Sequence, residues 1–233
     1  LMWFGTDNGL VRYDGRNVEP VAGEASLPSR RILALKLDAR GSLWIGTDAG
    51  AARWREDRIE VLEEARKQTV TSIDASPQGE VAMITAQGEV LRYRERRDDQ
   101  PHSESAAPAH LSITKLSPAT HAVLKSPNQP NEALPLASIA SFQMGRQTSG
   151  QTRGQTSGPN EIDEWLVGSS GRGVLVTQAG DLHEATSKPP RPYFVASVFV
   201  DAGRVWLGEQ GERQAGGLWL LKGSVPLRQP IDT

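Results

Sequence analysis

Residues 43–54 of the sequence, LWIGTDAGAARW, repeat residues 1–13, LMWFGTDNGLVRY, almost letter for letter. Weaker copies follow as WLVGS at residues 165–169 and WLGE at residues 206–209. Trp3 and Trp44 lie 41 residues apart, and Trp165 and Trp206 are again separated by 41 residues. A fixed period of about 40 residues is typical of a β-propeller, in which each repeat forms one four-stranded blade. The repeat therefore predicts an all-β fold.

Each copy of the repeat has the pattern of a β-hairpin. Residues 1–6 form an apolar strand, Asp7-Asn8-Gly9 supplies residues that tolerate a tight turn, and residues 10–13 return. An inner strand should precede each hairpin. The sequence predicts such strands at Ile32–Asp38, Val70–Asp74 and Val195–Asp201.

The period divides the chain into one propeller domain, residues 1–233, of about six blades, either a complete set or part of a seven-bladed ring. The expected units are residues 1–29, which lack an inner strand, and 30–68, 69–106, 109–135, 136–192 and 193–233. Within the degenerate fourth unit, Leu111–Leu116 is an expected strand. The segment QTSGQTRGQTSG at residues 147–158 repeats a Gln-Thr-x-Gly unit, which predicts a flexible insertion.

Composition excludes several classes of function. The formal net charge of −2 provides no general attraction to nucleic acid or to an anionic membrane. The absence of cysteine excludes disulfides, thiolate metal sites and a cysteine nucleophile. No apolar run approaches the roughly 20 residues that span a bilayer, so we expect no membrane contact by this segment. Because the sequence opens inside a strand motif without a signal peptide, we expect a fragment or an excised domain.

The repeated tryptophans and glycines are predicted to pack neighbouring blades together. Large aromatic side chains at the same place in each repeat let adjacent sheets share a core, and glycine permits close approach. The predicted packing residues are Trp3, Gly5, Trp44, Gly46, Trp165, Gly168, Trp206 and Gly208. Trp54 and Trp219 lie later in their units and are better candidates for an exposed contact surface, although packing is the favoured interpretation there too.

No catalytic or metal-binding residues are predicted, and no cofactor. Asp7, Asp38 and Asp48 occupy turn positions, where aspartate caps backbone groups, and no segment has the spacing of a calcium loop. The four histidines form no metal-ligating pair; they are His102, His110, His121 and His183.

The pattern Leu-Trp-Ile-Gly-Thr-Asp-x-Gly-x-x-Arg-Trp at residues 43–54 resembles the two-component regulator propeller repeat. The unit at Trp3 matches it closely, the units at Trp165 and Trp206 keep the tryptophan and a glycine, and the unit at Ala82 keeps Thr85, Gly88 and Arg92-Tyr93 without the tryptophan. The resemblance implies the extracytoplasmic sensor region of a bacterial hybrid histidine kinase or related regulator. It further implies a periplasmic or extracellular location.

The leading hypothesis is a non-enzymatic module of a bacterial signal-transduction protein. It would bind a small molecule, glycan or partner protein where loops from several blades converge, with no nucleic acid as partner. One alternative is an enzyme similar to streptogramin-lyase propellers, because residues 206–210, WLGEQ, faintly resemble their repeats. Another is a scaffold propeller for protein assembly. The ligand itself is not predicted.

Overall fold

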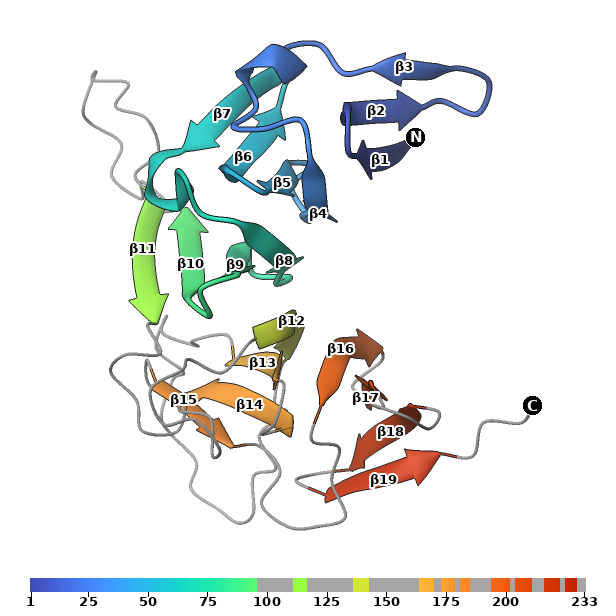
Figure 1. Cartoon of the computed structure of the whole chain (residues 1–233), viewed down its shortest axis with the longest axis vertical. Coiled ribbons are helices and arrows are strands. Elements are labelled where there is room, and N and C mark those ends of the chain that lie inside the picture. The colour runs from blue at the N-terminus through green and yellow to red at the C-terminus, as the bar shows by residue number, and fades with distance from the viewer. Residues whose placement is uncertain are drawn as a thin grey trace, which may run out of the picture.

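The computed structural model describes residues 1–95, 111–116, 136–142, 164–169, 173–178, 181–184, 194–201, 204–210, 216–222 and 225–229. Within these residues the strands form five antiparallel sheets, each a meander in which consecutive strands pair (Figure 1). The predicted all-β propeller fold is confirmed.

The first sheet has three strands: β1 (Met2–Thr6), β2 (Gly9–Tyr13) and β3 (Val18–Pro20). The second consists of β4 (Ile32–Leu37), β5 (Leu43–Thr47), β6 (Gly50–Arg55) and β7 (Arg58–Leu62). The third consists of β8 (Val70–Ala75), β9 (Glu80–Thr85), β10 (Val90–Glu95) and β11 (Leu111–Leu116). The fourth consists of β12 (Leu136–Phe142), β13 (Glu164–Ser169), β14 (Gly173–Gln178) and β15 (Asp181–Glu184). The fifth consists of β16 (Val195–Asp201), β17 (Arg204–Glu209), β18 (Gly217–Lys222) and β19 (Val225–Gln229).

The sheets follow one another in an arc, with β4, β8, β12 and β16 on its inner side (Figure 1). These inner strands contact one another in sequence, and β4 also contacts β1. The predicted inner strands at residues 32–38, 70–74 and 195–201 are therefore present as β4, β8 and β16. Among the described residues no inner strand pairs with β1 in the first sheet, as the sequence predicts.

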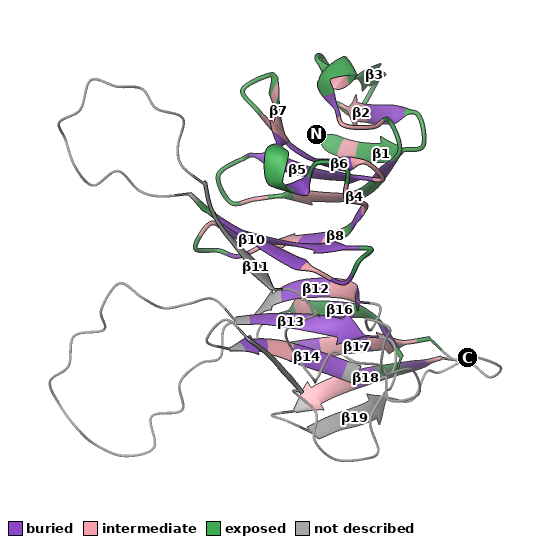
Figure 2. Cartoon of the chain, turned by 60° about the vertical axis from the view of Figure 1, so that its left-hand side comes forward, coloured by how far each residue is buried: buried purple, intermediate pink, exposed green. Residues whose placement is uncertain are grey.

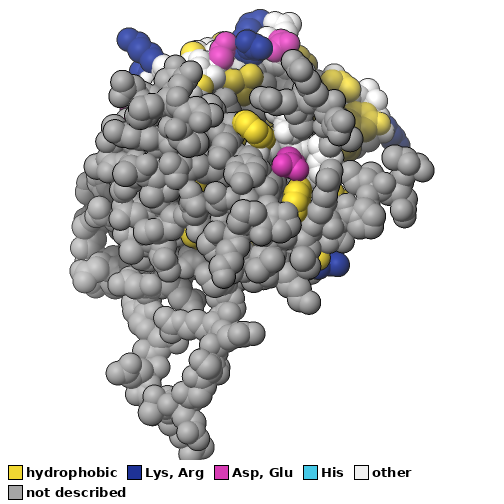
Figure 3. Space-filling view, turned by 60° about the horizontal axis from the view of Figure 1, so that its bottom comes forward, with side chains coloured by type: hydrophobic (Ala, Val, Ile, Leu, Met, Phe, Trp, Pro, Cys, Tyr) yellow, Lys and Arg dark blue, Asp and Glu magenta, His cyan; other side chains and the backbone are white. Residues whose placement is uncertain are grey.

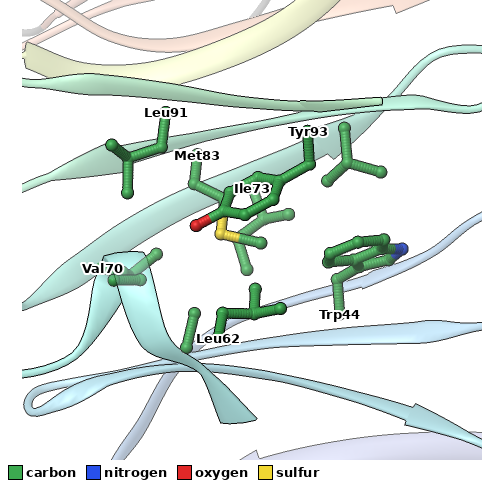
Figure 4. Close-up of a cluster of buried hydrophobic side chains, with 10 residues drawn as sticks. Trp44, Leu62, Val70, Ile73, Met83, Leu91 and Tyr93 are labelled. Atoms are coloured by element: carbon green, nitrogen blue, oxygen red, sulfur yellow. The ribbon is translucent and has the colours of Figure 1, made fainter. Parts of the chain in front are cut away.

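Four apolar layers between successive sheets hold the arc together. In the layer between the second and third sheets, Trp44 and Leu62 meet Met83, Leu91 and Tyr93 (Figure 4). β5 and β9 are buried on both faces, which explains why these two strands show almost no polar alternation. Burial is deepest in the middle of the arc, whereas β1 is largely exposed (Figure 2).

One strand lies in a different sheet from the one expected. Leu111–Leu116 was expected in a separate unit at residues 109–135, but it pairs along its whole length with β10 and completes the third sheet. A short apolar strand has the same pattern whether it is innermost or outermost, so only its pairing partner decides its place. Residues 117–135 and the expected insertion at 147–158 lie outside the described residues, and the number of blades stays a prediction.

Helical structure in the described part of the chain is limited to two short 3-10 turns, η1 (Glu24–Ser26) and η2 (Glu63–Ala65). Among these residues no helix has the length and apolar character needed to cross a membrane.

Candidate functional site

The threonine of the Gly-Thr-Asp-x-Gly motif closes the hairpin turn. Thr47 Oγ1 donates to the carbonyl of Gly50 at 2.8 Å and accepts from the amide of Ala49 at 3.2 Å. Thr6 makes the same two bonds in the first sheet. Gly9 and Gly50 have positive φ, a conformation that glycine adopts without steric cost. This part of the motif is therefore a structural turn.

The residue after this threonine connects the turn to the chain segment that enters the inner strand. The amide of Asp48 donates to the carbonyl of Arg31 at 3.3 Å, and the equivalent amide of Ala86 donates to the carbonyl of Thr69 at 2.8 Å. Gln210 donates to Phe194 at 2.9 Å in the last sheet. The hairpin turns and the starts of the inner strands thus share one face of the arc, which we call the turn face.

Trp44 is packed between sheets and hydrogen-bonded to a turn of its own sheet. Its side chain is 3% exposed, its Nε1 donates to Asp38 Oδ2 at 2.8 Å, and the Arg53 guanidinium lies 5.6 Å from its ring centroid. Asp38 Oδ1 also accepts the amides of Arg40 and Ser42. Asp38 is thus a turn-forming residue, as its sequence position indicates.

The repeated glycines lie where the next inner strand crosses. A Cβ on Gly46 would lie 2.9 Å from the carbonyl oxygen of Val70, and one on Gly168 would lie 2.7 Å from that of Val195. A Cβ on Gly5 would also meet the inner strand of the next sheet, but at the side chain of Ile32. Gly208 differs, because a Cβ there would meet only Ser197 of its own sheet among its nearest neighbours.

Trp165 does not occupy the place of Trp44, contrary to the expectation of identical positions. Gly46 pairs with Ala34 and Gly168 pairs with Ser138, so these two glycines occupy equivalent positions in their sheets. Trp44 lies two residues before Gly46, and the residue two before Gly168 is Leu166, which is therefore the counterpart of Trp44. A shift of one residue in a strand moves a side chain to the opposite face. Trp165 is fully buried against the preceding sheet, whereas Trp44 is buried against the following one.

Trp54 and Trp219 also pack rather than form an exposed surface. The ring of Trp54 lies 4.7 Å from that of Trp3 in the layer between the first two sheets. Trp219 is buried against the fourth sheet, and its Nε1 donates to Glu209 Oε2 at 2.9 Å. Trp206 is half-buried beneath the guanidinium of Arg204, at 6.0 Å.

The face opposite the turn face holds ion pairs that no local sequence pattern indicates, and two of them involve inner strands or buried side chains. Glu80 binds Arg92 at 2.7 Å with both side chains buried, and the partly exposed Arg94 reaches the same carboxylate at 3.4 Å. Lys36 and Asp74 form an ion pair between neighbouring inner strands.

The turn face carries exposed charges of both signs. Arg31 Nε lies 3.2 Å from Asp7 Oδ1, joining the start of the second sheet to the hairpin turn of the first, and both side chains are more than half exposed. The repeat pattern places Asp7 in the hairpin turn, whereas no motif in the sequence marks Arg31. The pair is a candidate site because it lies where two units of the repeat meet.

No three histidine, aspartate or glutamate side chains of the described residues come together as a metal site. His102, His110 and His121 lie outside those residues, and the side chain of His183 is also not described.

Successive four-stranded meanders that share apolar layers along an arc define a β-propeller protein. Residues 26–49 match the model of the two component regulator propeller family, which confirms the resemblance found in the repeat. No curated protein matches the sequence significantly.

Solved structures share the fold at low sequence identity. The extracellular domain of BT4673 from B. thetaiotaomicron, described as part of a one component system, aligns with a TM-score of 0.58 and 18% identity over 97% of this chain. That of BT3049 from the same organism, described as part of a hybrid two component system, aligns with a TM-score of 0.52 and 14% identity over 88% of this chain. The chain spans 25% and 24% of these two structures. YCF48 bound to D1 peptide aligns with a TM-score of 0.52 and 14% identity over 99% of this chain and 60% of its own.

Proposed function

We propose that this chain is a sensing propeller of a bacterial signal-transduction protein, acts without catalysis, and binds its ligand at the turn face. The observation that carries the proposal is the exposed Arg31–Asp7 pair between two repeat units. The match of residues 26–49 to a regulator propeller family and the fold shared with extracellular domains of signalling proteins support it. A periplasmic or extracellular location is part of the same proposal.

The repeat motif itself leaves few groups for chemistry. The hydroxyl of Thr47, the carboxylate of Asp38 and the indole of Trp44 are all used in turns and packing. Ligand recognition would therefore come from side chains outside the motif, as in other repeat folds where loops from several units converge. Arg31 provides a planar donor for carboxylate or phosphate oxygens, and Asp7 accepts from hydroxyl and ammonium groups.

A binding screen tests this proposal. Thermal shift and calorimetry would probe sugars, oligosaccharides, amino acids and organic acids against the wild-type chain and the Arg31→Gln and Asp7→Asn variants. We expect a ligand whose Kd rises about tenfold in at least one variant, because each loses a charged hydrogen bond. The matched control is Arg204→Gln, since Arg204 is an exposed arginine paired with Asp201 on the opposite face. A ligand whose affinity falls only with Arg204→Gln would place the site on that face and contradict the proposal.

A peptide is the second candidate ligand. YCF48, which shares the fold over most of this chain, is described as bound to a D1 peptide. Extended peptides therefore belong in the same screen. Turnover of any compound in the panel, measured by mass spectrometry of the incubated mixtures, would contradict the non-enzymatic assignment.

A further inference from the structure

The second copy of the hairpin turn contains a carboxylate oxygen that is buried without a donor. Asp48 occupies the position that Asp7 occupies in the first sheet, since each follows the threonine that closes its hairpin turn. The side chain of Asp48 is half-buried, and its Oδ1 is buried with no hydrogen-bond partner among the described residues. A buried carboxylate oxygen normally accepts a hydrogen bond, because an ionised group that leaves water without gaining a donor loses solvation energy. This atom therefore indicates that a donor is missing at the turn.

In the first sheet, the equivalent carboxylate is bound by the residue that precedes the next inner strand. Arg31 lies immediately before β4, and its Nε reaches Asp7 Oδ1 at 3.2 Å. Thr69 lies immediately before β8 and is the equivalent of Arg31, since the carbonyl of each accepts the amide that follows a hairpin threonine. The first junction between sheets therefore has a guanidinium beside the turn carboxylate, whereas the second junction has a hydroxyl at that place.

The hydroxyl of Thr69 does not satisfy the carboxylate, because it binds the main chain instead. Thr69 Oγ1 donates to the carbonyl oxygen of Asp48 at 2.9 Å, and the amide of Lys67 donates to the carbonyl of Ala49 at 2.8 Å. These two bonds hold the segment before β8 along the turn. Gln68 lies between them in the chain, and its Oε1 is a second buried oxygen without a partner among the described residues. The junction thus contains two buried acceptors whose donors are missing.

The surroundings of Asp48 favour an organic cation as the missing group. The contact between Arg31 and Asp7 shows that a guanidinium fits beside this position of the turn. A primary ammonium group has only donors and suits the same carboxylate and amide oxygens. A carboxylate with one oxygen shielded from water attracts a cation more strongly than a fully exposed carboxylate, because the local dielectric constant is lower. In Figure 3, acidic and basic side chains of the described residues lie close together on the surface, so recognition depends on local contacts rather than on the field of a whole face.

We propose that Asp48 is the cation-binding residue of the turn face and binds a guanidinium or primary ammonium group of the ligand, at the place equivalent to that of Arg31 in the first unit. The inference rests on the proposed function, in which the ligand binds at the turn face, and it adds the chemical class of that ligand. The ligand is a small organic cation, either an amine or a guanidino compound. Gln68 provides a second oxygen acceptor on the same segment.

Titration with defined probes, followed by nuclear magnetic resonance, tests this inference. N-acetylarginine methyl ester carries a guanidinium as its single charge, and N-acetylcitrulline methyl ester has nearly the same shape without the charge. n-Butylamine provides an ammonium group. The Kd of each probe is measured for the wild-type chain and the Asp48→Asn variant at low ionic strength, because salt screens a partly exposed pair. Asp201→Asn is the matched control, since Asp201 is an exposed carboxylate paired with Arg204 on the opposite face.

A Thr69→Arg variant tests the same site in the opposite direction. It places an arginine at the position equivalent to Arg31, so that the chain itself supplies the guanidinium for Asp48 and excludes the probes. Melting temperatures show whether this pair forms. Thr69→Arg should affect the melting temperature more favourably in the wild-type background than in the Asp48→Asn background, because only the former retains the countercharge.

We expect saturable binding of both cationic probes and none of the citrulline compound. The Kd should rise about fivefold or more with Asp48→Asn and with Thr69→Arg, because each removes a charged hydrogen bond to the probe, and should stay unchanged with Asp201→Asn. Equal affinities of the wild-type chain and Asp48→Asn would overturn the inference. Absence of binding to the wild-type chain would also overturn it, and binding that then appears with Lys67→Gln would identify Lys67 as the missing donor.

Two further outcomes separate this inference from the proposed function. Binding of Ca²⁺, in place of the organic cations and with the same dependence on Asp48, would overturn the inference but keep the ligand at the turn face. A ligand from the screen whose affinity depends on Arg31 or Asp7 and not on Asp48 would likewise overturn the inference and leave the proposed function standing. A cationic ligand whose affinity falls only with Arg204→Gln would contradict both.

Discussion

The indole Nε1 of Trp44 donates a 2.8 Å hydrogen bond to Oδ2 of Asp38, the residue that begins the turn between β4 and β5. One carboxylate thus organises a turn and orients the aromatic side chain that packs the second sheet on the third. This hydrogen bond therefore links the β4–β5 turn to the packing of the second sheet on the third, which explains why Asp38 and Trp44 occur together in this unit.

Replacing Asp38 by alanine should lower the free energy of unfolding by about 1–3 kcal/mol, because partly buried donors lose their acceptor. Urea denaturation measures this loss. Asp7→Ala is the control, since its exposed carboxylate pairs only at the surface, and it should change stability little. Equal effects of the two substitutions would show that the indole and turn bonds of Asp38 contribute nothing beyond a surface charge.

Gly46→Ala should destabilise the protein by about 1–3 kcal/mol through overpacking. The added Cβ would lie 2.9 Å from both Cγ1 and the backbone oxygen of Val70, and the backbone cannot move without shifting β8. Gly208→Ala is the matched control, because the new methyl group meets mainly the hydroxyl of Ser197, which can rotate. The melting temperature of Gly46→Ala should therefore fall well below that of Gly208→Ala, and the reverse order would contradict the packing described.

Glu80→Gln should cost about 3 kcal/mol or more of unfolding free energy, because it removes the negative charge that binds the buried guanidinium of Arg92. Glu60→Gln, which affects an exposed carboxylate paired with Arg53, should cost about 1 kcal/mol or less. Denaturation in low and high salt separates the two cases. The Glu60 effect should fall with salt and the Glu80 effect should persist, since buried pairs are screened far less.

Tyr93 should remain protonated at alkaline pH. Burial, and to a lesser extent the nearby charge of Glu64, raise the pKa of its phenol well above the ordinary value of 10. The unfolded chain ionises this group near its ordinary pKa, so its contribution to stability is constant below about pH 10 and decreases as pH rises above that value. Spectrophotometric titration of tyrosinate and denaturation at several alkaline pH values would show this.

Tyr93→Phe provides the control for that titration. Among the described residues the buried phenol oxygen has no hydrogen-bond partner, so its removal should leave stability at neutral pH nearly unchanged. The variant should lose less stability at high pH than the wild-type protein. An unchanged alkaline profile would show that another group causes the loss.

Much of the architecture could be predicted from the repeat because its residues have local roles. Thr47 and Gly50 define a hairpin through contacts within four residues, and a 41-residue period places the next hairpin. The approach of Gly46 and Gly168 to the next inner strand also follows, since a missing side chain at a fixed position indicates close packing.

Other features depended on pairing that no local pattern specifies. Trp165 is offset by one residue from Trp44, and only the register of β13 with β12 shows that it faces the opposite sheet. Leu111–Leu116 has the pattern of either an inner or an outer strand. The candidate pair of Asp7 and Arg31 joins residues 24 positions apart through a side-chain contact that neither residue's local sequence indicates.

The sequence alone determined the fold class and the hairpin turns, and it indicated the close approach of Gly46 and Gly168 to the next inner strand, because these features depend on short-range geometry repeated along the chain. Only the tertiary structure decided which face each tryptophan covers, which charges are buried in pairs and which are exposed at the turn face. It also showed that Ser197 lies beside the same register shift of its inner strand as Ser72 and Ser138 do in theirs. These outcomes depend on strand register and on contacts between sheets, where a shift of one residue reverses the direction of a side chain.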